Sequence, residues 1–193
     1  MLKEFIDFVN SVLPSVSPDF RDGAKNAIAQ FEKTGEKIHY LMVKPLNELS
    51  QGDILSHIPF MYFDDNGSQK VFVADAFVIS TSCNIDNKDT VLLAPVLPLD
   101  QFKGDLVNLK KNRIFDYMFI DETVLADKYI AFEYINPYSK NLITDIIDKK
   151  KTRRVASLNQ IGYYFFVIKL TVYFLRKEDD DTLKRRNIEF GYD

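Results

Sequence analysis

The segment 51–99 constrains the fold more than any other part of the chain, because it holds three β-strand patterns separated by two turns. Asn66-Gly67 lies between two runs rich in β-branched and aromatic residues, and an Asn-Gly pair in that setting is typical of a tight hairpin turn. We therefore expect a β-hairpin with arms over 53–63 and 69–80.

Further strand patterns surround this hairpin. The run 90–96 is almost entirely apolar, which predicts a central strand with Pro95 at its end. Other strands are expected over 37–43, 112–120 and 128–135. Five or six strands suffice for a small β-barrel, which we expect between about residues 37 and 135.

Helical patterns flank the strands. Apolar residues at three- and four-residue steps predict a helical hairpin over 1–36. Ser157 and Gln160 match a capping box, which predicts a long C-terminal helix from Leu158 to about Lys177. The expected fold is α+β, with a helical hairpin joined to a β-barrel domain over 37–193 in one compact unit.

Composition limits the class of protein. Apolar residues make up 46% of the 193 positions, which predicts a globular chain. The formal charge of −3 gives no global attraction to nucleic acid or acidic lipid. The longest apolar run covers the 15 residues 161–175, short of the roughly 20 that span a bilayer, and no signal peptide is recognised. One cysteine and no signal peptide predict a cytoplasmic protein without a membrane partner.

Three short motifs resemble the PemK/MazF/CcdB-type toxin superfamily of SH3-like barrels: Gly52-Asp53-Ile54, Val78-Ile79-Ser80, and Leu92-Leu93-Ala94-Pro95. The resemblance covers about residues 51–99. It implies an SH3-like barrel from a bacterial toxin–antitoxin or defence system, with a cognate antitoxin as partner. It also implies a metal-independent endoribonuclease.

The sequence departs from that superfamily at its acid–base positions. The arginine beside a proline that precedes the Val-Ile-Ser strand is replaced by Ala74-Asp75-Ala76-Phe77, and no Ser or Thr follows the Ala-Pro strand at 96–98. The fold can be retained while the activity is lost, so we expect at most a degenerate nuclease. The turn 80–85 also resembles a motif of uncharacterised bacterial proteins, for which no reaction is implied.

Candidate catalytic residues are Cys83, Asp86 and Arg113. A thiolate at Cys83 would be a nucleophile if a nearby base or positive charge lowered the thiol pKa, but neither His39 nor His57 is brought to it by the sequence. The favoured alternatives are a small buried cysteine and an ion-paired Arg113. These isolated residues lack zinc-site spacing, so we expect no metal and no cofactor.

A basic run before the last helix is the strongest local charge feature and would suit RNA phosphates. A solvated loop is the favoured alternative. The candidate nucleic-acid contacts are Lys149, Lys150, Lys151, Arg153, Arg154, Lys169 and Arg176.

Two functions follow from the sequence. The first is an RNA-binding protein of the toxin–antitoxin or defence type. The second is a non-catalytic interaction module that binds a partner, or forms a homodimer, through its aromatic helix over 157–176. In the second case Phe166 would lie in the interface.

Overall fold

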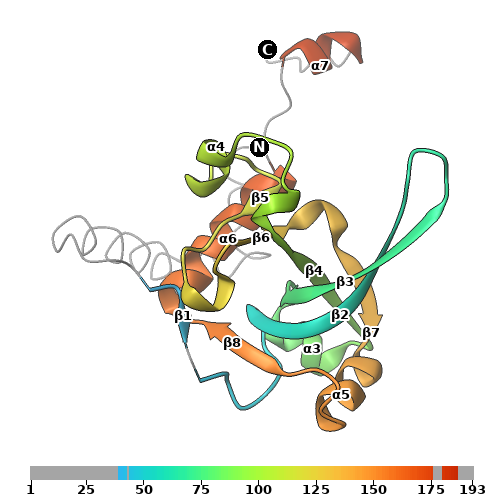
Figure 1. Cartoon of the computed structure of the whole chain (residues 1–193), viewed down its shortest axis with the longest axis vertical. Helices are drawn as coiled ribbons and strands as arrows, with labels where there is room; N and C mark the ends of the chain where they lie inside the picture. The colour runs from blue at the N-terminus through green and yellow to red at the C-terminus, as the bar shows by residue number, and fades with distance from the viewer. Residues whose placement is uncertain (1–38, 43, 176–179, 187–193) are drawn as a thin grey trace, which may run out of the picture.

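The computed structural model describes residues 39–42, 44–175 and 180–186 (Figure 1). The helical hairpin expected over 1–36 lies outside the described residues. The strands are β1 (Leu41–Met42), β2 (Asp53–Phe63), β3 (Gln69–Val78), β4 (Thr90–Pro98), β5 (Tyr117–Met118), β6 (Lys128–Ala131), β7 (Asn136–Ser139) and β8 (Arg154–Leu158). The helices are α3 (Ser82–Asn87), η2 (Leu99–Gln101), α4 (Leu106–Lys110), η3 (Thr123–Leu125), η4 (Phe132–Tyr134), α5 (Lys140–Asp148), α6 (Gln160–Leu175) and α7 (Asp180–Arg185), of which those written η are 3-10 helices.

All eight strands belong to one antiparallel sheet, in the order β1-β8-β2-β3-β4-β6-β5, with β7 also paired to β4. The α+β class is therefore confirmed. The sheet coils strongly in Figure 1, but within the described residues β1 and β5 lie at its two ends and do not pair with each other. The sheet is open, and closure into a small barrel stays a prediction.

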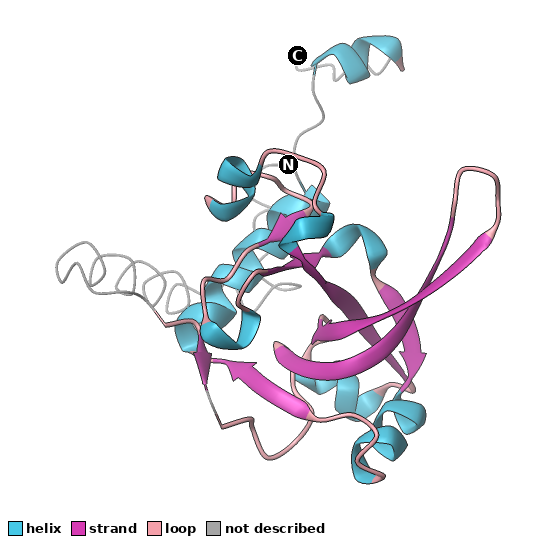
Figure 2. Cartoon of the chain, viewed as in Figure 1, coloured by secondary structure: helices cyan, strands magenta, loops and turns pink. Residues whose placement is uncertain are grey.

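The β2–β3 hairpin forms where the sequence predicts it. Gly67 has a φ of +74°, a conformation that glycine adopts without steric cost. The backbone N–H groups of Asn66 and Ser68 both donate to Asp64 Oδ1, at 3.0 and 2.9 Å, and fix the turn. The two arms extend away from the other strands of the sheet (Figure 2). The tip of the hairpin thus stands away from the sheet's centre.

Strand β4 is also confirmed, but the prediction for Pro95 is wrong. Pro95 lies inside the strand, opposite Ala76 of β3. Along the other edge, β4 pairs with β7 up to Leu93 and with β6 from Val96 onward. Pro95 therefore lies at the changeover between two partners, where a missing N–H costs no ladder hydrogen bond.

The strands expected over 112–120 and 128–135 are much shorter in the structure. Asn112 has a φ of +55°, and its side chain bonds both backbone groups of Phe119, at 2.8 and 2.9 Å. These bonds form a loop, so only the two residues of β5 pair with β6. After four residues of β6 the chain turns into η4. Local side-chain bonds have replaced extended pairing here.

The long C-terminal helix is confirmed, but the prediction for its first residue is wrong. Residues up to Leu158 belong to β8, and α6 begins at Gln160. The capping side chain is Asn159, whose Oδ1 accepts from the N–H of Gly162 at 2.9 Å. Ser157 is instead fully buried and donates to the carboxylate of Asp53.

Helix α6 can lie close to β1 because Gly162 has no side chain. A Cβ at this position would stand 2.2 Å from the backbone oxygen of Tyr40 and 2.9 Å from Leu158 Cδ2. The N–H of Asn159 donates to the same Tyr40 oxygen at 2.9 Å. The junction between sheet edge and helix thus requires glycine.

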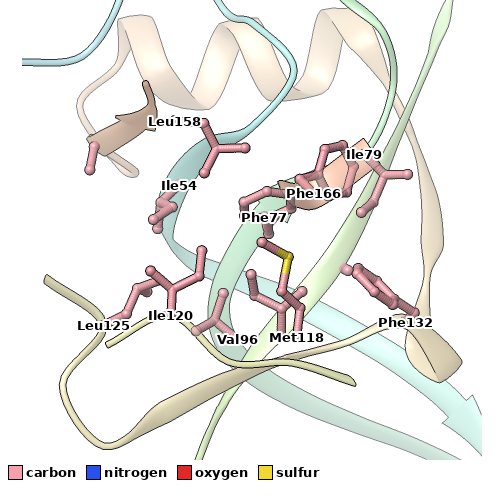
Figure 3. Close-up of a cluster of buried hydrophobic side chains, with 13 residues drawn as sticks. Ile54, Phe77, Ile79, Val96, Met118, Ile120, Leu125, Phe132, Leu158 and Phe166 are labelled. Atoms are coloured by element: carbon pink, nitrogen blue, oxygen red, sulfur yellow. The ribbon is translucent and has the colours of Figure 1, made fainter. Parts of the chain in front are cut away.

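Apolar cores fill both faces of the sheet. On one face, side chains of the central strands meet Phe166 of α6 (Figure 3). The ring of Phe166 is fully buried, with its centroid 5.0 Å from that of Phe77. On the other face, Ile85 of α3 and Ile143 of α5 pack against β2, β3 and β4. Phe166 is therefore a core residue, and its expected place in an interface is wrong.

Candidate binding cleft

A cleft opens where β3 and β4 diverge. The two strands pair with each other only over residues 75–78 of β3. Beyond this ladder, the end of β4 pairs with β6, whereas the earlier residues of β3 pair only with β2 and form the hairpin arm. The space between them has a volume of about 830 Å³. It is bounded by the hairpin arm, the end of β4, the segment after η2, and the β6–η4 region.

Aromatic rings line much of this cleft. Phe102, Tyr117 and Tyr129 form a mutually packed trio, in which every pair of centroids is 5.3 or 5.4 Å apart and the rings meet edge to face. Tyr134 joins this wall to the hairpin, with centroid distances of 5.4 Å to Tyr62 and 6.2 Å to Phe72. The cleft therefore offers flat apolar surfaces with phenol groups among them. The aromatic lining residues are Tyr62, Phe72, Phe102, Tyr117, Tyr129 and Tyr134.

One carboxylate lies among these rings. Glu133 Oε1 accepts a hydrogen bond from the Tyr117 hydroxyl at 2.9 Å. Burial, with a further contribution from Glu133, raises the pKa of Tyr129 to about 12. The same two causes raise the pKa of Tyr117 and of Tyr134. The three phenols are therefore protonated donors across the physiological range.

The hairpin arm presents an open strand edge to the cleft. The Met61 N–H donates to a side-chain amide of β7 at 2.8 Å, and the Pro59 carbonyl accepts from a tyrosine hydroxyl of β7 at 2.7 Å, so both groups point away from β3. Their partners across the antiparallel ladder, Val71 and Val73, must then direct their own N–H and C=O groups away from β2. Among the described residues no strand pairs with this second edge of β3, the one that faces away from β2, at Val71 and Val73.

Both arms of the hairpin, β2 and β3, expose large apolar side chains. Phe63, Val71 and Val73 are each about two-thirds exposed, at 64%, 63% and 64%, and Met61 is 42% exposed. A long apolar edge strand of this kind is a template for pairing with another chain, unless charge or covering structure protects it. This arrangement favours a binding surface over a purely structural hairpin.

Two of the candidate catalytic residues, Cys83 and Asp86, lie three residues apart on α3, and Arg113 follows α4. Cys83 is exposed on α3, with its sulfur 3.2 Å from the Thr81 hydroxyl, so the expectation of a buried cysteine is wrong. Asp86 lines a separate depression of about 330 Å³ beside Arg154. Arg113 is exposed after α4. Within the described residues no group of three His, Cys, Asp or Glu side chains is placed to hold a metal.

The basic run divides between surface and interior. The side chains of Lys149, Lys150, Lys151 and Arg153 are exposed, and Lys149 pairs with Asp145 of its own helix at 2.8 Å. The others are placed differently, because Arg154 lies in β8 and Thr152 is buried.

Arg154 has a structural role, because its side chain joins β8 to the loop before β2. Its guanidinium donates to the backbone oxygens of Leu46 and Asn47 at 2.7 and 2.8 Å, and lies 3.9 Å from the Asp53 carboxylate. Arg154 thereby ties the loop before β2 to β8, leaving less of its donor capacity for an RNA phosphate than a free surface arginine would have.

Lys169 is separated from the exposed cations because it is 6% exposed inside the fold. Its ammonium donates to the backbone oxygens of Ile114 at 2.7 Å and Asn112 at 3.2 Å. Burial lowers its pKa to about 8. Lys169 thus fastens the loop that carries Ile114, a residue of the cleft wall. Arg176 lies outside the described residues.

One further sequence pattern, outside the predictions above, indicates the exposed apolar surface beside the cleft. Apolar residues occupy both faces of each strand near the hairpin turn, as in Met61-Tyr62-Phe63 and Val71-Phe72-Val73. A hairpin covered on one face would alternate apolar with polar residues. The sequence therefore predicts exposed apolar side chains near the tip of the hairpin.

Among the described residues, no helix combines the length and the apolar character that a membrane crossing requires. The chain matches no family model, and no curated protein is similar to it in sequence. The geometry of the cleft is therefore the feature that indicates a function.

Proposed function

We propose that the protein is a binding protein that captures an extended segment of a partner protein in the aromatic cleft. The observation that carries the proposal is the open edge of β3 at Val71 and Val73, which adjoins the aromatic wall of the cleft. An extended segment would pair with this edge as an additional strand, with backbone hydrogen bonds supplying affinity and the cleft selecting side chains.

The proposal extends to a specific fold type and to a biological setting. The coiled antiparallel sheet is compatible with a small SH3-like barrel, and the motifs within 51–99 resemble the PemK/MazF/CcdB-type superfamily. In that setting the protein would act in the cytoplasm in a toxin–antitoxin or defence system, and the captured segment would belong to a cognate antitoxin. Binding would be its main activity, since none of Cys83, Asp86 and Arg113 lines the cleft.

Replacing Val73 with proline tests the proposal. The change removes the N–H that faces the open edge and spares the β2–β3 ladder, and proline is tolerated in edge strands. Extended eight-residue peptides are first selected from a random display library on the full chain. We expect them to bind Val73→Pro at least about tenfold more weakly, the equivalent of about 1.4 kcal/mol, as measured by fluorescence anisotropy.

Val73→Thr is the matched control, because it keeps the N–H and the strand preference and should retain binding. Far-ultraviolet circular dichroism checks that both variants fold. If Val73→Pro disturbs the hairpin, Tyr134→Ala removes a ring of the cleft wall instead. Equal peptide affinity for the wild type and a folded Val73→Pro variant would contradict strand addition at this edge.

RNA binding is a second candidate function, favoured by the exposed cations at the end of α5. Exchanging Lys150 and Lys151 for glutamine should weaken binding of a single-stranded RNA probe. It should also reduce the slope of log affinity against log salt by about 0.7 for each lost phosphate contact. The equally exposed pair Lys110 and Lys111 provides the charge-matched control. The same slope for both double variants would speak against this surface.

A further inference from the structure

We infer that the segment captured in the cleft presents a lysine or arginine side chain to Glu133, between the rings of the aromatic wall. This inference rests on the proposed function and adds the chemistry of the ligand. It draws on the charges within the cleft, the ring geometry, and the direction of side chains on an added strand.

The charge at the aromatic wall is negative. Glu133 is exposed and lies beside the Tyr117 hydroxyl, at 2.9 Å from its oxygen. Glu133 acts electrostatically on the phenols of Tyr117, Tyr129 and Tyr134, and Asp116 adds to its effect on Tyr117. The ligand group that this field favours is a cation.

Two lysines, Lys70 and Lys103, also line the cleft, but neither is among the charges that act on the phenols of the aromatic wall. Lys70 lies on the hairpin and pairs with Asp64 at 3.3 Å. Lys128 pairs with Asp75 at 2.7 Å. Lys103 lies in the segment after η2, and no lysine is among the charges that act on the three phenols of the wall.

The rings suit the same kind of ligand. The faces of tyrosine and phenylalanine rings attract an ammonium or guanidinium group within about 6 Å of the centroid. The aliphatic stem of lysine or arginine would pack on the apolar wall while its charged end reaches Glu133. A phosphate group at this position would be repelled by the Glu133 carboxylate, which favours a basic side chain over a phosphate at the aromatic wall.

Strand alternation brings such a side chain to the right face. On a strand added to β3, every second side chain lies on the same face of the sheet as Phe72. Phe72 contacts Tyr134 at a centroid distance of 6.2 Å, and Glu133 is the residue before Tyr134. A side chain on that face therefore extends toward the aromatic wall, whereas its sequence neighbours extend toward Val71 and Val73 on the opposite face.

The test uses the display selection on the full chain. We expect lysine or arginine to be enriched at one position of the selected eight-residue peptides. Replacing that arginine with citrulline, or that lysine with norleucine, removes the charge at similar length and should weaken binding to the wild type about tenfold. The Glu133→Gln variant should bind the charged and neutral peptides with affinities within about twofold of each other.

The outcomes separate this inference from the proposed function. Peptides that bind the wild type but not Val73→Pro, with no preference for a basic residue, would overturn the inference and leave the proposed function standing. Selection of no binding peptide, or binding insensitive to both Val73→Pro and Tyr134→Ala, would overturn both. The comparison of charged and neutral peptides on the wild type decides the inference even if Glu133→Gln does not fold.

Discussion

Replacing Phe166 with alanine is expected to lower the free energy of unfolding by about 3 to 5 kcal/mol, the usual cost of truncating a fully buried phenylalanine. The ring has no solvent exposure, and its centroid lies 5.0 Å from that of Phe77 and 6.4 Å from that of Phe132. Its removal would leave a cavity between α6 and the sheet. Urea unfolding followed by circular dichroism measures the loss, since the chain has no tryptophan.

Ile168 provides the matched control on the same helix. Its side chain is 46% exposed, so Ile168→Ala should cost less than about 1.5 kcal/mol. A smaller loss for Phe166→Ala than for Ile168→Ala would show that α6 does not cover the sheet in the way described. Because Phe166 is buried, a charge placed there would unfold the chain before it could report on any dimer.

Replacing Asp53 with leucine is expected to cost about 3 to 5 kcal/mol, as for the loss of one partner from a buried ionic network. The fully buried carboxylate accepts from the Ser50 N–H at 2.9 Å and from the Ser157 hydroxyl, and lies 3.9 Å from Arg154. Leucine would leave these donors unsatisfied. Urea unfolding measures the loss, and the exposed Asp89→Leu, expected within about 0.5 kcal/mol of wild type, is the control.

The same carboxylate predicts a dependence of stability on pH. Burial raises the pKa of Asp53, against the opposing effects of Ser157, Ser50 and Arg154. A pKa above the unfolded value means that the folded state holds the proton more tightly, so this contribution is fully present below about pH 4 and is lost as the pH rises through the folded pKa. Relative to the non-titrating Asp53→Asn variant, wild type should lose stability as the pH rises. A relative gain would contradict the assigned direction.

The sequence allowed prediction of the elements whose signals are local. The hairpin turn at Asn66-Gly67 and the apolar run of β4 each depend on neighbouring residues, and both were found. The first residue of α6 was missed because Ser157 matches a capping pattern, yet its hydroxyl bonds to a carboxylate 104 positions earlier. Contacts at that separation leave no periodic pattern in the sequence.

The candidate site was much less predictable than the fold. The aromatic wall draws its rings from the hairpin, the segment after η2, β5, β6 and η4, which only the topology brings together. The basic run illustrates the converse. Arg153 and Arg154 are adjacent in sequence, yet Arg153 is exposed while Arg154 lies in β8 and bonds to the loop before β2. The charge pattern predicts one surface for both residues, because no local signal in the sequence shows that β8 begins at Arg154.

The position of β8 in the sheet has a consequence for how the chain folds. The β2–β3 and β3–β4 ladders join strands that are close in sequence, but β2 pairs on its other edge with β8, and Asp53 lies opposite Ser157. Pairings over such separations carry a high loop-closure cost and form slowly. During synthesis, the β2 edge has no partner strand until the chain has extended past Leu158. In that interval β2 is an uncovered edge strand, which is prone to pair with other chains and aggregate. The β2 edge is therefore closed late, only once β8 is present to pair with it.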